Sequence, residues 1–134
     1  MCGIVGIISS KEVSARIINS LKKLEYRGYD SAGIATLVNG NINEVKCEGR
    51  VDLLERDIHK FNLKGDIGIG HVRWATHGKP SKINAHPHSS EQVSVVHNGI
   101  IENSTILKKF LEKKGYVFKS QTDTEVIAHL VTDY

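Results

Sequence analysis

The second residue of the chain is a cysteine, and Gly3 and a short apolar segment follow it directly. If Met1 is removed, Cys2 carries both a thiol and a free α-amine. The reference pKa of an α-amine, about 7.7 to 8.0, leaves roughly a tenth of it unprotonated near pH 7, so it can accept the proton of a thiol of pKa about 8.5. Cys2 is therefore a candidate nucleophile that supplies its own base. A small buried hydrophobic side chain is the alternative interpretation.

Asn98 and Gly99 form a second candidate group. An asparagine side-chain amide and the backbone N–H of a neighbouring glycine can offer two donors to one developing oxyanion. Asn-Gly is also a common hairpin turn, so the local sequence leaves both interpretations open. Asn39-Gly40, in contrast, lies between two expected strands, and we assign it to a type I′ turn.

Two charged residues are candidates for ligand binding. Arg73 ends an expected strand and precedes a long loop, where a guanidinium group can receive a carboxylate through two parallel hydrogen bonds. An exposed ion pair is the alternative for Arg73. Asp123 lies at the start of an expected helix, where capping explains an acidic residue better than ligand binding does. The local sequence therefore does not decide the role of either residue.

Five of the seven histidines fall within 27 positions of one another: His71, His77, His86, His88 and His97. A metal site is one interpretation, but His86-Pro87-His88 lacks the i, i+4 register or the cysteine partners that are typical of zinc sites. We therefore expect neither a metal nor another cofactor. The charged residues Lys108, Lys109, Lys113 and Lys114 are assigned to the solvated face of a helix.

The composition is that of one globular domain of 134 residues. Lys plus Arg number 18 and Asp plus Glu 15, and the resulting net charge of +3 is too small to indicate a nucleic-acid partner. No apolar segment approaches the roughly 20 residues that span a bilayer, and we expect neither a membrane span nor a signal peptide. The only cysteines, Cys2 and Cys47, are too few for a disulfide framework, which favours a reducing cytoplasm.

Hydrophobic periodicity predicts the elements that position the candidate residues. Strands are expected at 3–8, 32–38, 42–47, 66–73, 93–97 and 116–119. The second of these strands pairs antiparallel with the third. Helices are expected at 11–24 with Ser10 as N-cap, at 51–61, and at 104–114 with Gly115 as C-cap. Residues 74–92 form a long connection, and such loops are usually functional.

A last helix is expected to begin at the segment Thr122-Asp123-Thr124-Glu125, which matches the capping-box pattern. Its apolar residues are Val126, Ile127, Leu130 and Val131. The helix reaches Tyr134 without a terminating glycine or a basic last turn, so we expect the chain to be a fragment of something longer. The elements together predict a mixed α and β domain.

Residues 1–6 resemble the start of class II glutamine amidotransferases, which belong to the N-terminal-nucleophile hydrolase superfamily. Four further segments are similar to the glucosamine-6-phosphate synthase branch of that family. They are residues 25–33 (EYRGYDSAG), 71–78 (HVRWATHG), 97–103 (HNGIIEN) and 122–127 (TDTEVI). The resemblance runs from residue 1 to about residue 131.

The resemblance implies a role for each candidate residue. Cys2 corresponds to the nucleophile, whose own amine serves as base and whose thiol forms a glutamyl thioester. Asn98 and Gly99 correspond to the oxyanion hole. Arg73 and Asp123 correspond to the residues that hold the α-carboxylate and the α-ammonium group of glutamine. The loop that closes over glutamine and helps couple it to ammonia transfer corresponds to Trp74, Thr76 and His77.

The resemblance also implies an α+β fold, a four-layer αββα sandwich that is incomplete at its C-terminus. Residues 1–134 would be the N-terminal portion of the glutaminase domain, without the sugar-isomerase domains. The implied activity is hydrolysis of L-glutamine to glutamate and ammonia. In the full-length enzyme, expected to be a homo-oligomer, that ammonia converts fructose 6-phosphate to glucosamine 6-phosphate. With Met1 retained, this chain alone is expected to be inactive. The alternative is a non-enzymatic glutamine-binding or regulatory module.

Overall fold

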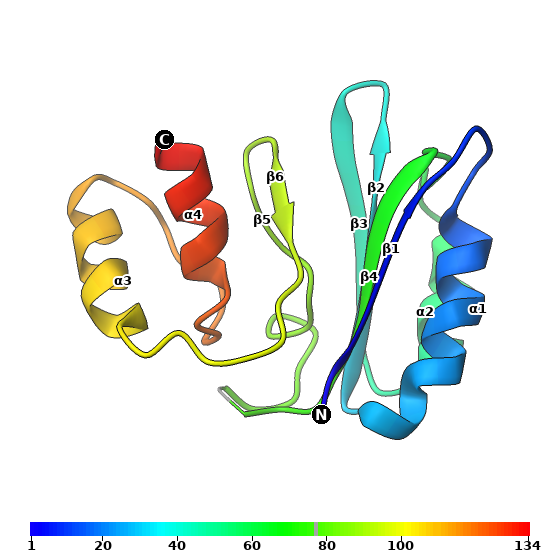
Figure 1. Ribbon diagram of the computed structural model, residues 1–134, viewed down its shortest axis with the longest axis horizontal. Helices are drawn as coiled ribbons and strands as arrows, with labels where there is room; N and C mark the ends of the chain where they lie inside the picture. The colour runs from blue at the N-terminus through cyan, green and yellow to red at the C-terminus, as the bar shows by residue number, and fades with distance from the viewer. Residues whose placement is uncertain (77) are drawn as a thin grey trace.

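The computed structural model describes residues 1–76 and 78–134, and Figure 1 shows them in four layers. Two helices cover one face of a four-stranded sheet, a two-stranded sheet lies on its other side, and two further helices form the outer layer. The helices are α1 (Ser14–Leu24), α2 (Val51–Ile58), α3 (Ser104–Lys113) and α4 (Glu125–Asp133), with a short 3-10 helix η1 (Glu25–Arg27) after α1. The expected α+β class and αββα layering are confirmed.

The larger sheet places the start of the chain beside residues that lie about 70 positions further along. Its strands are β1 (Gly3–Ile8), β2 (Ser31–Val38), β3 (Asn41–Glu48) and β4 (Ile67–Arg73). They run antiparallel in the order β1-β4-β2-β3, and Gly3 pairs with Val72. Asn39 and Gly40, with φ of 51° and 79°, confirm the type I′ turn between β2 and β3. The start of β1 therefore lies at the end of β4.

Glycines in β4 let α1 pack closely on the sheet. A Cβ at Gly70 would come within 2.5 Å of Ile17 Cγ2, and a Cβ at Gly68 within 2.7 Å of Ile17 Cδ1. Ile17 and Leu21 of α1 are fully buried, as helical spacing predicts for the apolar face of an amphipathic helix. The apolar core therefore lies between α1, α2 and the four-stranded sheet.

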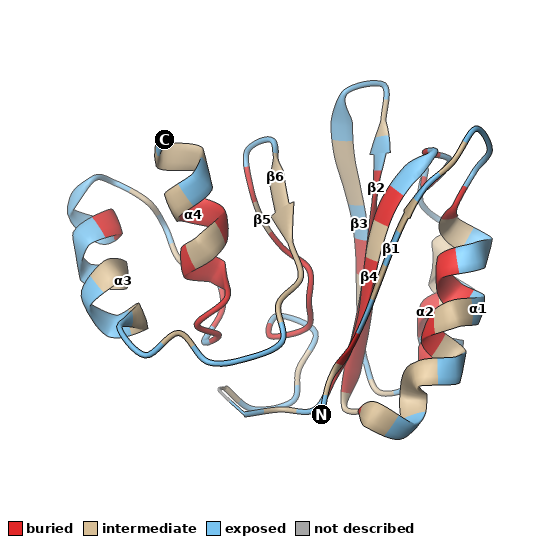
Figure 2. Ribbon diagram, viewed as in Figure 1, coloured by how far each residue is buried: buried red, intermediate tan, exposed pale blue. Residues whose placement is uncertain are grey.

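The other face of that sheet is lined by buried polar side chains. Val72 belongs to the apolar core, and successive residues of a strand point to opposite faces, so His71 and Arg73 face the second sheet. Both are buried, with 0% and 3% of their surface exposed. Figure 2 shows buried residues on both sides of the larger sheet and along the inner face of α4. This polar layer between the sheets leads to the candidate site.

The second sheet consists of β5 (His88–Ser90) and β6 (Val93–Val95), which form an antiparallel hairpin. The sequence predicted a connection where β5 lies, because its residues are all polar and show no apolar alternation. The strand expected at 93–97 ends at Val95. His97 and Asn98 therefore lie beyond the strand, in the loop that precedes α3.

Two helix boundaries and one expected strand also differ from the prediction. Helix α1 begins at Ser14, so Ser10 is not its N-cap, and α2 ends at Ile58. Residues 116–119 do not form the expected strand; the Lys119 N–H donates instead to a Glu125 carboxylate oxygen. Gly115 follows α3 with φ of 96°, as expected for the end of that helix. Within the described residues, no helix has the length and apolar character needed to cross a membrane.

Candidate active site

A pocket of about 380 Å³ opens where β1 begins and β4 ends. Seven of the eight predicted site residues line it: Cys2, Arg73, Trp74, Thr76, Asn98, Gly99 and Asp123. The eighth, His77, lies outside the described residues. The residue before β1, the end of β4 with the loop after it, the loop after β6 and the segment before α4 therefore meet at one pocket.

Cys2 is held against the backbone of the loop that follows β4. The Trp74 N–H donates to Cys2 Sγ at 3.2 Å, and the Trp74 carbonyl oxygen lies 3.5 Å from the same sulfur. This contact follows from the pairing of Gly3 with Val72. Cys2 is only partly buried, so a ligand in the pocket can reach its sulfur. The interpretation of Cys2 as a buried hydrophobic residue does not fit this placement.

Asn98 reaches from the loop after β6 to the backbone of Cys2. Its Nδ2 donates to the Cys2 carbonyl oxygen at 3.1 Å. Gly99 has φ of 140°, a value that favours glycine, and a Cβ there would come within 3.2 Å of His97 Nε2. The dipeptide lies between β6 and α3, so it does not form the hairpin turn that the sequence left open.

Arg73 organises the loop that forms one wall of the pocket. Its guanidinium group donates to the carbonyl oxygens of Gly78 at 3.0 Å and Lys79 at 3.3 Å. Burial lowers the pKa of Arg73, although nearby acidic groups oppose that shift. Arg73 is thus a buried cation at the pocket, and the alternative of an exposed ion pair is wrong. A guanidinium group carries its five N–H donors in a planar fork, which matches the geometry of a carboxylate ligand.

Asp123 places a carboxylate on the same pocket. Its Oδ2 accepts the backbone N–H of Ile101 at 2.7 Å, and Ile101 lies two residues after Gly99 in the same loop. The helix that follows begins only at Glu125, so the side chain of Asp123 does not cap it. A buried cation and a carboxylate therefore line one pocket, and this pair of charges matches the two ends of a free amino acid.

Asp30 joins the turn before β2 to the loop after β4. Its carboxylate accepts the Ala75 N–H and the Ser31 hydroxyl, and its backbone N–H donates to the Arg73 carbonyl oxygen at 3.2 Å. The half-exposed ring of Trp74 meets the ring of Tyr29 edge-on, with 6.3 Å between the centroids. The backbone on both sides of Trp74 is therefore anchored, while its indole ring remains at the surface.

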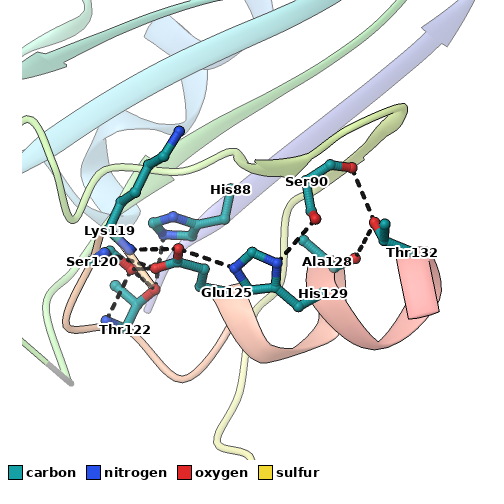
Figure 3. A network of polar contacts seen from close by, with 9 residues as sticks. All are labelled: His88, Ser90, Lys119, Ser120, Thr122, Glu125, Ala128, His129 and Thr132. Atoms are coloured by element: carbon teal, nitrogen blue, oxygen red, sulfur yellow. Dashed lines mark hydrogen bonds and ion pairs between the residues drawn. The ribbon is translucent and has the colours of Figure 1, made fainter. Parts of the chain in front are cut away.

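A buried polar network supports the segment that carries Asp123 (Figure 3). Glu125 accepts the N–H groups of Lys119 and Ser120, each at 2.7 Å, and the Ser120 hydroxyl at 2.6 Å. The capping box expected from the sequence is therefore absent, because the Glu125 carboxylate accepts the N–H groups of Lys119 and Ser120, whereas the Thr122 N–H donates to the Ser120 hydroxyl. Thr122 Oγ1 lies 2.9 Å from His88 Nε2, which ties this segment to β5.

His129 links the same network to the second sheet. Its Nδ1 lies 2.9 Å from Ser90 Oγ, and its Nε2 lies 3.4 Å from Glu125. Burial would raise the pKa of Glu125, but the hydrogen bonds from Ser120 and Lys119 lower it below its ordinary value. Glu125 is therefore a buried, ionised anchor for the loop that ends at Asp123.

Sequence reasoning missed several residues that line the pocket, among them Arg27, His86, His97, Thr122 and Thr124. The spacing of the histidines bears on metal binding alone and does not predict that His86 and His97 line this pocket. In the structure, the His71 and His86 rings stack 4.1 Å apart, and His88 meets His86 edge-on at 4.7 Å. Among the described residues, no group of three His, Cys, Asp or Glu side chains could hold a metal ion.

Comparison with known proteins identifies the family. Residues 71–134 match the model of the glutamine amidotransferase domain. The glutamine–fructose-6-phosphate aminotransferases (isomerizing) of Clostridium acetobutylicum and Bradyrhizobium diazoefficiens are 59% and 56% identical to the chain. These matches cover 100% and 99% of the chain but only 22% of each relative. The chain therefore spans about a fifth of the length of the curated relatives it matches.

Solved structures agree with this assignment at the level of the fold. The glutamine phosphoribosylpyrophosphate amidotransferase of B. subtilis, complexed with ADP and GMP, superposes with a TM-score of 0.82 at 30% identity. A structure described as the allosteric regulatory enzyme of purine biosynthesis superposes with a TM-score of 0.81 at 31% identity. Each match covers 100% of this chain and 30% of the other chain. The chain belongs to the glutamine amidotransferase family, has the N-terminal-nucleophile hydrolase fold, and corresponds to the N-terminal portion of the aminotransferases that it matches.

Proposed function

We propose that this chain carries the glutaminase half-reaction, in which the side-chain amide of L-glutamine is hydrolysed to glutamate and ammonia. One observation carries the proposal: the Cys2 sulfur, the Asn98 amide, the Arg73 guanidinium group and the Asp123 carboxylate line the same pocket of about 380 Å³. A nucleophile, an oxyanion donor and groups for both charged ends of an amino acid are the parts that this reaction needs.

Cys2 supplies the nucleophile once Met1 has been removed. Its α-amine takes the thiol proton, and the thiolate attacks the amide carbon of glutamine. The backbone N–H of Trp74, at 3.2 Å from the sulfur, stabilises negative charge there. The tetrahedral intermediate expels ammonia, which leaves with a proton from the α-ammonium group. Water then attacks the thioester, which releases glutamate and regenerates the thiol.

Asn98 and Gly99 stabilise the oxyanion of the tetrahedral intermediate. An asparagine NH₂ group has two hydrogens, so one can bond to the Cys2 carbonyl oxygen while the other meets the oxyanion. The backbone N–H of Gly99, a residue that lines the same pocket, is the second donor in this proposal. Donors that are already in position need no rearrangement when charge develops.

Arg73 and Asp123 select glutamine as a free amino acid. The guanidinium group receives the α-carboxylate, and the Asp123 carboxylate receives the α-ammonium group. Trp74, Thr76 and His77 belong to the loop that closes over the bound substrate. The bonds from Arg73 to Gly78 and Lys79 support this assignment, because they link the substrate-binding cation directly to that loop.

The proposal extends to the longer protein that the relatives' names suggest. Residues 1–134 would be the N-terminal portion of its glutaminase domain, and sugar-isomerase domains elsewhere would use the ammonia to convert fructose 6-phosphate to glucosamine 6-phosphate. We place this activity in the cytoplasm, because Cys2 and Cys47 are both free thiols. We also propose that the full-length enzyme is a homo-oligomer.

The test is covalent labelling with 6-diazo-5-oxo-norleucine, a glutamine analogue that alkylates a glutaminase nucleophile. After Met1 removal, intact mass should show one adduct, and excess glutamine should slow its formation. Cys2→Ala should abolish the adduct and glutamate release, whereas Cys47→Ala should keep both, because Cys47 lies in the apolar core. Glutamine binding without an adduct or turnover would contradict the proposal and indicate a binding module.

A further inference from the structure

His71 lies directly behind Asn98, on the side away from the pocket. Its Nε2 is 2.9 Å from Asn98 Oδ1, while Asn98 Nδ2 is 3.1 Å from the Cys2 carbonyl oxygen. His71 is fully buried in β4 and does not line the pocket, whereas Asn98 does. His71 can therefore act on a bound ligand only through neighbours that line the pocket, of which Asn98 is hydrogen-bonded to it and His86 is stacked on it.

The three groups allow only one distribution of hydrogens. A carbonyl oxygen accepts but does not donate, so the Cys2 oxygen requires the NH₂ side of the Asn98 amide. The Asn98 oxygen then faces His71 Nε2, and it too can only accept. His71 must therefore carry its proton on Nε2. With the proton on Nδ1, two lone pairs would face each other, and the Asn98 amide would be favoured in the flipped orientation.

The surroundings of His71 favour this tautomer. Its Nε2 faces the Asn98 oxygen at 2.9 Å, whereas its Nδ1 makes no hydrogen bond of acceptable geometry within the described residues. Burial lowers the pKa of His71 to about 4, so the ring carries a single proton at neutral pH. The His97 backbone raises the pKa of His71, but less than the Asn98 side chain does, so the stronger acceptor lies on the Nε2 side of the ring. The parallel stack on His86, at 4.1 Å and 11°, holds the plane of the ring.

We infer that His71 is a positioning residue that fixes the Asn98 amide with its nitrogen toward Cys2 and the oxyanion. The inference rests on the proposed function, because it gives His71 a role only if Asn98 stabilises the oxyanion. A flipped amide would present an oxygen where negative charge develops. The Nε2 proton of His71 prevents that flip without touching the substrate.

Three substitutions of His71 separate this role from simple packing. A glutamine side chain can place its amide nitrogen near the position of Nε2, whereas an asparagine side chain is too short and a leucine has no donor. In the natural protein that carries this chain, with Met1 removed, His71→Asn and His71→Leu should lower kcat for glutamate release at least about 10-fold. The KM for glutamine should change less than about 2-fold, and His71→Gln should keep most of the wild-type kcat.

A double-mutant cycle gives the decisive measurement. If His71 acts only through Asn98, His71→Asn should cause no further loss of kcat in an Asn98→Ala background. Losses that multiply independently would overturn the inference, as would an unchanged kcat in His71→Asn or an equal loss in His71→Gln. The control is Thr36→Val, a buried polar substitution in the neighbouring strand β2, which should leave kcat unchanged.

Thermal unfolding of every variant completes the test. If neither His71→Asn nor His71→Leu folds cooperatively, His71 is required for folding and the inference is wrong. The proposed function can be tested separately with Cys2→Ala and Asn98→Ala. If those two variants keep their activity, the proposed function fails. If they lose activity but the His71 variants do not follow the expected pattern, only the inference fails.

Discussion

The sulfur of Cys2 accepts a hydrogen bond from the backbone N–H of Trp74, 72 residues further along the chain. The contact exists because β1 and β4 are neighbouring antiparallel strands, with Gly3 opposite Val72. It joins the candidate nucleophile to the loop that carries the candidate substrate-binding residues. A change in the position of that loop therefore alters the hydrogen bond to the sulfur directly.

Asn98→Ala should mainly lower kcat for glutamate release. Loss of one oxyanion-hole donor removes on the order of 3 kcal/mol of transition-state stabilisation, which corresponds to roughly a 100-fold decrease. Steady-state kinetics on the processed protein measures this. A change confined to KM would show that Asn98 binds ground-state glutamine instead.

Arg73→Lys should mainly weaken glutamine binding. A lysine ammonium group cannot reproduce the planar pair of hydrogen bonds to a carboxylate, and it cannot hold the carbonyl oxygens of Gly78 and Lys79 at the same time. Isothermal titration calorimetry with a Cys2→Ala background would measure binding without turnover. Arg16→Lys, at an exposed position on α1, is the matched control. Equal affinities in both variants would refute the assigned role of Arg73.

Glu125→Gln should loosen the segment that carries Asp123. A neutral amide cannot accept from Lys119 N–H, Ser120 N–H and Ser120 Oγ as a carboxylate does. We expect a lower melting temperature and a raised KM for glutamine, with a smaller effect on kcat. A raised KM that is not accompanied by a lower melting temperature would contradict this explanation.

The buried histidines should make the chain less stable in mild acid. Burial lowers the pKa of His71 from 6.5 to about 4 and that of His88 from 6.5 to about 3. Between pH 6.5 and 4, the unfolded state binds protons that the folded state does not, so stability falls as the pH falls. For His71 alone the full shift corresponds to on the order of 3 kcal/mol.

Urea unfolding followed by circular dichroism between pH 7.5 and 4.5 checks this prediction. The range stops at 4.5 because the lowered pKa of Glu125 adds its own loss of stability below that value. His88→Gln should give a shallower dependence on pH than the wild type. A midpoint that stays constant across this range would show that the histidines are not held neutral in the folded state.

Retention of Met1 should abolish the glutaminase activity. The nitrogen of the Met1–Cys2 peptide bond is not basic enough to take the thiol proton at neutral pH, and Met1 itself lines the pocket. Glutamate release should appear only after an aminopeptidase has removed Met1, in this chain or in a longer version of the protein. Turnover by the unprocessed protein would mean that another group acts as base.

Local patterns in the sequence were enough to predict those elements whose stability depends on near neighbours. A short apolar run predicted β1, helical apolar spacing predicted α1, and alternating apolar residues predicted β4. Asn39-Gly40 predicted the turn between β2 and β3. Other segments were harder to predict from the sequence. Strand β5 has no apolar alternation, and the strand expected at 116–119 does not form because it has no partner strand. In both cases the outcome depended on contacts with residues distant in the chain.

The residue types of Cys2, Asn98, Arg73 and Asp123 suggested their chemistry, but each also allowed an ordinary structural interpretation. Only the antiparallel order β1-β4-β2-β3 and the stacking of two sheets bring them to one pocket. The tertiary structure also decided the place of His71 behind Asn98, since no local pattern relates two residues 27 positions apart. Hydrogen bonds act over about 3 Å, so which donor meets which acceptor is settled by packing and not by spacing along the sequence.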